Sequence, residues 1–373
     1  MGDLSKSEDL KNTVKQFIHD YQANNKAIIK SYRVEGNVAT GNAFSGIASL
    51  EFEYKIGKRK KAQIKTGKAI MKIPSLAPMP QEEIKNFQVL FDREVLFYKT
   101  ILPELYKLGQ CKPFAPIFYT ATETNAMVME DLRADGFKPG ERSFYLDWYQ
   151  CLKSLEVLAT YHAFGYKYLQ SLDMNDPRWR LIALAPMGKP DTNDVDDFMK
   201  VMEPYLNEGV HQKILQLRNE IAMLEEYPNE NRMYVLIHGD FRSDNIFFKY
   251  DSENKPCEAK IIDWQLSREN NPVIDLFFFF SNNLPVELLL DYGDDVLNYY
   301  LEILNKNLAL SKANRSYDRL ELDSDIVYYK HITFDVIISG LLKSVQRATS
   351  AEDPSLANAI RWLVFMYKVG IFS

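Results

Sequence analysis

Residues 235–264 constrain this chain more than any other stretch. Apolar residues lead into a turn that holds His238 and Asp240, and Asn245 follows this aspartate by five positions. A second apolar run then ends in Asp263. Transfer of a phosphoryl group from ATP needs one carboxylate beside the attacking hydroxyl, and an amide oxygen with a second carboxylate to hold Mg²⁺ on the phosphates. The pattern therefore predicts Asp240 as the catalytic base, and Asn245 and Asp263 as magnesium ligands.

The gap between these two parts has the length of a short β-hairpin. Residues 246–248 and 259–262 are predicted strands, and the turn between them, 251–256, contains aspartate, asparagine and proline. A histidine and an aspartate at this spacing also occur by chance, and an aspartate after a strand is usually a turn former. Chance does not readily supply both elements, the asparagine and the hairpin in this order. A phosphotransferase is therefore the favoured interpretation.

The composition is that of an ordinary globular protein, and the length allows two domains or lobes. The 373 residues are 46% hydrophobic and 26% charged, and the formal net charge is −6. A chain of this length buries an ample core. The acidic balance argues against nucleic acid as the main partner, because a phosphate backbone attracts a basic surface. The one basic run, 58–61, lies between two strand-like segments, so we interpret it as a solvated hairpin tip.

The cysteines and apolar runs favour a reducing, cytoplasmic environment. The three cysteines are far apart and form neither a metal-binding pattern nor a disulfide framework. The first residues have no apolar core, so no signal peptide is expected. The apolar run 276–280 is much shorter than the ~20 residues of a membrane span, and we predict a buried helix there. We expect a monomer without membrane contact.

Upstream of the central stretch, the sequence predicts a helix followed by a β-rich region. Apolar residues have helical spacing within 4–30, and residues 47–54 alternate between polar and apolar. A glycine-bearing turn, 41–46, precedes this strand. Such turns can lay backbone N–H groups over phosphates, which makes Ser45 and Gly46 candidate nucleotide contacts.

Lys72 is a single cation within the apolar run 69–73. It follows the glycine turn by one strand, where a lysine that pairs with nucleotide phosphates belongs. Such a lysine needs a carboxylate on a following helix, and residues 81–108 have helical periodicity. We favour Glu94 over Asp92 because Glu94 shares the core-facing side of this helix. The alternative is a lysine on an edge strand that points to water, or an ordinary surface ion pair.

Two more strands, 116–120 and 125–129, complete a predicted antiparallel sheet of five strands with one helix between the third and the fourth. The chain then enters a loop with glycine and proline, which we interpret as a hinge. There, the carbonyl of Glu130 and the N–H of Leu132 are candidate partners for an adenine edge. The predicted N-terminal, nucleotide-binding lobe is 1–131.

Residues 132–373 are predicted to form a larger, mostly helical lobe, which makes the fold class α+β. Helical spacing marks the segments 144–172, 201–227, 285–308, 323–348 and 354–371. His162 lies on the apolar stripe of the first of these helices. We therefore interpret it as a hydrogen-bonded core histidine and not as a catalyst.

Three features favour a small molecule as the phosphate acceptor. Gly239 occupies the place where many protein kinases have an arginine that reads a phosphorylated activation loop. Twelve residues separate Asp263 from Asp275, too few for such a loop and a peptide platform. Roughly a hundred residues between the hinge and the central stretch enlarge the helical lobe. The predicted acceptor is a small hydroxylated compound held by that insert.

Together these motifs resemble the ecdysteroid kinase-like (CHK kinase-like) family, which groups with choline and aminoglycoside kinases in the bilobal protein-kinase-like fold. The resemblance covers about residue 28 to the C-terminus. It is carried by Gly-Asn-Ala-Phe-Ser-Gly at 41–46, Met-Lys-Ile-Pro at 71–74, Phe-Asp-Arg-Glu-Val-Leu-Phe-Tyr at 91–98, Val-Met-Glu-Asp-Leu at 128–132, Leu-Ala-Thr-Tyr-His-Ala at 158–163, His-Gly-Asp at 238–240 and Ile-Asp-Trp-Gln at 262–265.

The resemblance implies a role for each core residue. Lys72 would orient the α- and β-phosphates of ATP, and Glu94 would hold Lys72. Asp240 would be the base, and Asn245 with Asp263 would bind Mg²⁺. The eponymous acceptor is an ecdysteroid, and another sterol or a hydroxylated xenobiotic fits the same chemistry.

Some positions follow the family and others depart from it. Asp275 resembles the aspartate that braces the catalytic turn. Arg242 and Asp244 stand where the family commonly has tryptophan and asparagine, and Trp264 stands where phenylalanine is usual. An arginine near the γ-phosphate would assist the transition-state charge, whereas the alternative is a solvent-exposed or aspartate-paired side chain. These departures leave the predicted phosphoryl-transfer chemistry intact.

Two other functions fit parts of the sequence. The first is a choline- or aminoglycoside-type kinase, because a cationic substrate needs an aromatic and carboxylate pocket. Residues of both types occur in the insert, namely Trp148, Tyr149, Trp179, Asp173 and Asp176. The second is a catalytically inactive binding module on the same fold. The presence of all the core residues named above argues against it.

Overall fold

The computed structural model describes residues 8–36, 45–56, 63–74, 81–109, 111–123, 126–140, 145–183, 193–223, 231–347, 350 and 352–372. The loop residues 41–44 and the basic run 58–61, for which predictions were made above, lie outside this set. The chain divides into two compact units. Unit 1 comprises Met1–Pro103, Lys112–Lys138 and Lys260–Gln265, and unit 2 comprises Glu104–Cys111, Pro139–Ala259 and Leu266–Ser373.

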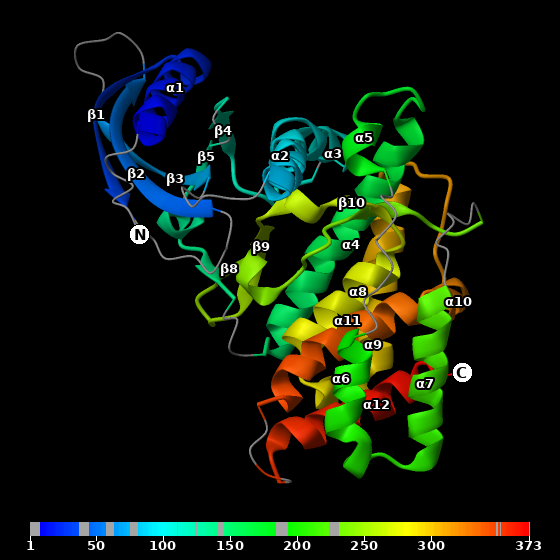
Figure 1. The fold of residues 1–373 in the computed structure, drawn as a ribbon. Coiled ribbons are helices and arrows are strands. Elements are labelled where there is room, and N and C mark those ends of the chain that lie inside the picture. Colours follow the sequence, from blue (N-terminus) through cyan, green and yellow to red (C-terminus); the bar gives the residue numbers. More distant parts are fainter. Residues whose placement is uncertain are drawn as a thin grey trace. The chain divides into compact units, whose positions relative to one another are not determined.

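Unit 1 is built on a five-stranded antiparallel sheet, which confirms the prediction (Figure 1). In pairing order its strands are β1 (Ala27–Gly36), β2 (Ser45–Ile56), β3 (Lys65–Pro74), β5 (Met127–Glu130) and β4 (Phe118–Ala121). Lys72 of β3 lies opposite Ile47 of β2 and opposite Met127 of β5. It therefore occupies a central strand and not an edge.

One face of this sheet is covered by helix α1 (Glu8–Asn25) (Figure 1). The buried core between them contains Leu10, Val14, Phe17 and Tyr21 of the helix with Ala48, Leu50, Phe52, Ala69, Met71 and Ile73 of the strands. Successive residues of a strand point to opposite faces of a sheet. Since Lys72 stands between Met71 and Ile73, its side chain lies on the face away from α1.

The predicted helix over 81–108 is interrupted in the structure. Helix α2 (Gln81–Leu96) continues into a π-helical turn, η2 (Phe97–Ile101), and then into α3 (Leu102–Gly109). A π-helical turn holds more residues than an α-helical one and re-aims the side chains that follow it, and such turns are frequent at functional sites. Tyr98 of this turn contacts the site described below.

Unit 2 is mostly helical, in agreement with the predicted α+β class. Its helices are α4 (Trp148–Ser171), α5 (Trp179–Ile182), α6 (Asn193–Met202), α7 (Glu208–Met223), α8 (Pro272–Asn283), α9 (Val286–Leu310), α10 (Arg319–Tyr328), α11 (Lys330–Val345) and α12 (Pro354–Lys368). Helix α4 packs against α9, and α11 packs against α6 and α8 (Figure 1). The predicted single helix 323–348 is wrong, because Tyr329 leaves the helical conformation between α10 and α11.

Short strands of unit 2 position the central stretch. Strand β7 (Val235–Ile237) pairs antiparallel with β10 (Arg268–Asn270). The predicted hairpin is formed by β8 (Ile246–Tyr250) and β9 (Pro256–Ile261), with β6 (Lys138–Pro139) on the other side of β8. The first part of β9 belongs to unit 2, whereas its end lies in the segment Lys260–Gln265, which belongs to unit 1.

The phenylalanine-rich run is the buried helix that the sequence predicts. It lies in α8, where Phe277, Phe279 and Phe280 are buried. Across the described ranges, no helix combines the length and the apolar character that crossing a bilayer requires.

Candidate active site

Three of the predicted site residues meet in unit 1 around the amino group of Lys72. Its Nζ donates to Oε2 of Glu94 at 2.6 Å and to Oδ1 of Asp263 at 2.8 Å. All three side chains are largely shielded from solvent. Asp92, the helix residue that was not favoured, is exposed and accepts a hydrogen bond from Gln88 instead.

The charges of this cluster keep Lys72 cationic. Burial alone would lower the pKa of the lysine, but the carboxylates of Glu94 and Asp263 outweigh it and raise that pKa. Burial raises the pKa of Glu94 above its ordinary value, against the opposing effect of Lys72. The proton therefore stays on the lysine, which presents a fixed cation of the kind that pairs with phosphate oxygens.

Asp263 is held in an unusual backbone conformation. Its φ is +68°, a region that few non-glycine residues adopt and that aspartate tolerates better than most. Its backbone N–H donates to the hydroxyl of Tyr98 at 3.3 Å. The indole of Trp264 stacks on Phe97 with ring centroids 6.1 Å apart. The position of the carboxylate is thus fixed by the π-helical turn and by aromatic packing, two contributions that the sequence patterns did not indicate.

The turn of unit 2 that holds His238 and Asp240 is braced by Asp275 of α8. Its carboxylate accepts from the backbone N–H of His238 at 2.6 Å and from that of Gly239 at 2.9 Å. It also contacts Nε2 of His162 at 3.1 Å, and the hydroxyl of Tyr300 lies 2.8 Å from Nδ1 of the same ring. His162 is therefore the hydrogen-bonded core histidine that its position on the apolar stripe predicts.

We expect Gly239→Ala to destabilise the fold more than the matched variant Gly136→Ala. Gly239 has a φ of +81°, and an added Cβ would lie 2.6 Å from the carbonyl oxygen of Leu266. Gly136 has a φ of +85°, but a Cβ there would meet no described atom within 4 Å. The left-handed conformation alone costs an L-residue ~1–2 kcal/mol. Urea denaturation should show that loss for Gly136→Ala and a clearly larger one for Gly239→Ala, and equal losses would contradict the steric argument.

Asp240 and Asn245 lie together in the same turn of unit 2. The amide nitrogen of Asn245 donates to the backbone carbonyl of Asp240 at 2.9 Å and to its Oδ2 at 3.1 Å. The oxygen end of this amide consequently points away from the aspartate, as a metal ligand requires. Oxygen ligands are those that Mg²⁺ prefers, and two protein ligands suffice beside nucleotide oxygens and water. The amide oxygen of Asn245 in unit 2 is a donor of this kind, and so is the carboxylate of Asp263 in unit 1.

Asn283, at the end of α8, holds the loop that follows Asp240, and the sequence reasoning missed it. Its Oδ1 accepts from the backbone N–H of Ser243 at 2.5 Å, and its Nδ2 donates to the carbonyl of Phe241 at 3.1 Å. Together with Asp275, it ties the whole turn to one helix. The polar end of the phenylalanine-rich run is the only trace of this role in the sequence.

The other predicted nucleotide contacts lie on the sheet of unit 1. Ser45 and Gly46 are the first residues of β2, next to β3, which carries Lys72. Glu130 ends β5, and its carboxylate forms an ion pair with Lys260 at 3.1 Å. Leu132 is buried at the start of a 3₁₀ turn, η3 (Leu132–Asp135). Their contacts with a nucleotide remain predictions.

Comparison with known proteins identifies the family. The model of the ecdysteroid kinase-like family matches residues 40–313, which is more than half of the 373-residue chain. The chain belongs to the ecdysteroid kinase-like family. This confirms the resemblance drawn from the motifs. The lysine–glutamate pair between β3 and the following helix is a mark of the protein-kinase-like fold.

Curated proteins similar to this family member are much longer than it is. The acyl-CoA dehydrogenase family member 11 of Homo sapiens is 27% identical over 177 residues, which is 45% of this chain and 20% of that protein. The protein of the same name from Gallus gallus is 37% identical over 78 residues, 18% of this chain and 9% of that protein. The matched part thus spans a fifth or less of these relatives.

Two solved structures are similar over nearly the whole chain. One is the gentamicin–APH(2")-IIa complex, with 16% identity, a TM-score of 0.39, and coverage of 94% of this chain and 98% of that chain. The other is the GDP complex of aminoglycoside 2'-phosphotransferase-IIIa, with 13% identity, a TM-score of 0.44, and coverage of 96% and 98%. Because these TM-scores are low, neither structure serves as a template for the site.

Proposed function

We propose that this protein transfers the γ-phosphate of ATP, with Mg²⁺, to a hydroxyl group of a small molecule. The acceptor class that we favour is an ecdysteroid, another sterol or a hydroxylated xenobiotic. The observation that carries this proposal is the catalytic turn of unit 2. There, the carboxylate of Asp240 is fixed by the amide of Asn245, and the turn is anchored on the buried Asp275.

Each residue has a distinct task in this reaction. Asp240 accepts the proton of the acceptor hydroxyl as that oxygen bonds to the γ-phosphorus, while the bond from this phosphorus to the β–γ bridging oxygen breaks and ADP leaves. A positioned base of this kind accelerates such steps by ~10²–10⁴-fold. Lys72 pairs with the α- and β-phosphates, and Glu94 keeps it in place. Asn245 and Asp263 are the residues that would hold Mg²⁺. The metal ion would neutralise charge on the β- and γ-phosphates.

A cationic acceptor of the choline or aminoglycoside type is less well supported. Such a substrate would need free carboxylates next to aromatic rings. Asp176 instead forms an ion pair with Arg178, whose guanidinium lies 2.7 Å from its carboxylate. The carboxylate of Asp173 accepts the backbone N–H of Asn175 at 2.7 Å, and the indole N–H of Trp179 donates to the backbone carbonyl of Asp173 at 2.8 Å. These groups are occupied within the protein, which favours an uncharged acceptor.

The acceptor class can be tested with a thermal-shift panel followed by a transfer assay. We expect sterols and other apolar alcohols to raise the melting temperature in the presence of ATP and Mg²⁺, and quaternary amines to leave it unchanged. Mass spectrometry of metabolite extracts incubated with labelled ATP would then identify the phosphorylated product. A shift with amines alone would overturn the acceptor class while leaving the phosphotransferase in place.

We expect phosphate transfer to stop when Mg²⁺ is chelated and to return when it is added back. In Asp263→Asn, one anionic metal ligand becomes neutral, so restoring half of the maximal rate should require a higher Mg²⁺ concentration. Lys72 keeps its partner Glu94 in this variant. Titration of Mg²⁺ against the initial rate measures the change. The exposed substitution Asp92→Asn is the control, and an unchanged titration curve for Asp263→Asn would refute its metal role.

A further inference from the structure

Arg242 lies between two aspartates of the catalytic loop. Its Nε is 3.0 Å from Oδ1 of Asp240 and 3.4 Å from Oδ1 of Asp244. Within the described residues, this Nε is buried and makes these contacts as an ion pair and not as a hydrogen bond. Of the alternatives that the sequence left open for Arg242, the structure shows the aspartate-paired one.

The backbone fixes Arg242 in this place. Its N–H donates to the carbonyl of Asp240 at 2.9 Å, and its own carbonyl accepts from the N–H of Asn245 at 2.9 Å. It precedes the 3₁₀ turn η5 (Ser243–Asn245) as its N-cap. The preceding residue, Phe241, is fully buried against Phe279 of α8. The side chain of Arg242 therefore leaves a rigid loop.

Both oxygens of the Asp240 carboxylate have a partner in this arrangement. Arg242 lies at Oδ1, and the amide of Asn245 donates to Oδ2. Two partners on opposite oxygens restrict the rotation of a carboxylate, whereas one partner leaves it free to turn. Because one guanidinium faces two carboxylates, its charge is already opposed in the loop. The geometry of the Arg242 guanidinium is therefore better suited to holding Asp240 in place than to binding a further anion.

We propose that Arg242 is a positioning residue for Asp240, and that Asp244 in turn holds Arg242. This inference rests on the proposed function, because it assigns the orientation of the base in that reaction. Correct placement of a reacting group raises the reaction rate by a large factor, and a displacement of ~1 Å can lower that rate ~10²-fold. Arg242 acts here through Asp240 and does not touch the acceptor or the phosphates.

The variant Arg242→Gln tests this role through a split between kcat and KM. We expect kcat to fall by about 10- to 10²-fold, with the KM for ATP unchanged, and Arg242→Lys to restore part of the rate because it keeps the cation. Wild-type kcat in Arg242→Gln would overturn the proposal.

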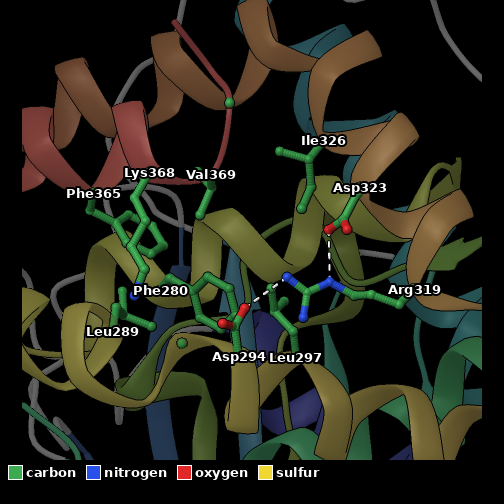
Figure 2. A pocket seen from close by; sticks show the side chains of 12 residues that line it. Phe280, Leu289, Asp294, Leu297, Arg319, Asp323, Ile326, Phe365, Lys368 and Val369 are labelled. Atoms are coloured by element: carbon green, nitrogen blue, oxygen red, sulfur yellow. Dashed lines mark hydrogen bonds and ion pairs between the residues drawn. The ribbon is translucent and has the colours of Figure 1, made fainter. Parts of the chain in front are cut away.

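Arg319 provides a matched control with the same arrangement of charges. It donates to Asp294 at 2.8 Å and to Asp323 at 2.7 Å, beside a cavity of about 300 Å³ between α9, α10 and α12 (Figure 2). Figure 2 shows its guanidinium between the two carboxylates. Arg319→Gln removes an equivalent ion pair away from the catalytic loop. It should leave kcat unchanged.

A double-mutant cycle separates positioning from direct contact with the transferred phosphoryl group. If Asp244 acts through Arg242, Asp244→Asn should lower kcat in the wild type and have little further effect in Arg242→Gln. If Arg242 instead stabilised the phosphoryl group, freeing it from Asp244 would maintain or raise kcat. That result would overturn the positioning role. An absence of phosphate transfer by the wild type with any acceptor would overturn the proposed function itself.

Discussion

Asp240→Asn should lower kcat for phosphate transfer by ~10²–10⁴-fold, the usual effect of removing a positioned base. The amide keeps the size of the side chain and an oxygen that can accept from Asn245, but it cannot take the proton of the acceptor hydroxyl. ATP contacts assigned to Lys72 are untouched. The loss should therefore appear in kcat, with little change in the KM for ATP, when steady-state rates are measured with a saturating acceptor.

The control for this substitution is Asp251→Asn in the turn of the hairpin. Asp251 is exposed and accepts the backbone N–H groups of Glu253 and Lys255 at 2.9 Å each, contacts that an asparagine oxygen can maintain. It should retain the wild-type rate. Near-normal kcat in Asp240→Asn would show that this residue is not the base. No detectable phosphate transfer by the wild type or by either variant would favour the inactive binding module over the enzyme.

The pairing of Lys72 with Glu94 could be predicted because each residue is placed by a local pattern. Strand alternation puts the lysine on one face of β3, and helical periodicity puts Glu94 on the core side of α2. The second partner of the lysine, Asp263, could not be inferred in this way. It lies 191 positions further along the chain, and its approach depends on β9 leaving unit 2 for unit 1.

What the sequence did not show depends on contacts between distant segments and on small irregularities of helices. Asn283 reaches the loop from 40 positions downstream of Ser243, and a polar residue at a helix end carries no mark of that contact. The π-helical turn that contains Tyr98 is only five residues long. Such a short change in the helical repeat does not disturb the apolar pattern of residues 81–108, so the pattern does not reveal it. The break between α10 and α11 at Tyr329 was hidden for the same reason.

A second large effect is expected from Asp275→Asn, this time on stability. Asp275 is fully buried and accepts two backbone N–H groups of the catalytic turn, from His238 and Gly239. Asparagine removes the charge and turns a donor toward one of these N–H groups. Breaking a buried, paired charge usually destabilises a protein by ~3–5 kcal/mol. Urea denaturation at neutral pH should show a loss of this size, while the exposed control Asp92→Asn should lose almost none.

The pH dependence of that loss identifies its electrostatic part. Burial alone would raise the pKa of Asp275, but the hydrogen bond from His162, the charges of His162 and His238, and the N–H of Gly239 outweigh it and lower that pKa. A carboxylate with a depressed pKa stabilises the fold above its unfolded value of about 3.9, and this contribution is lost as the pH falls through the folded pKa.

The difference in unfolding free energy between wild type and Asp275→Asn should therefore be largest near neutral pH and shrink in acid. A difference that stayed constant down to low pH would mean that Asp275 acts through packing alone. In that case the turn would be held mainly by Asn283, and Asn283→Ala would be expected to be the more damaging change. If the difference shrinks as expected, the same carboxylate both stabilises α8 against the turn and sets the backbone from which Asp240 projects.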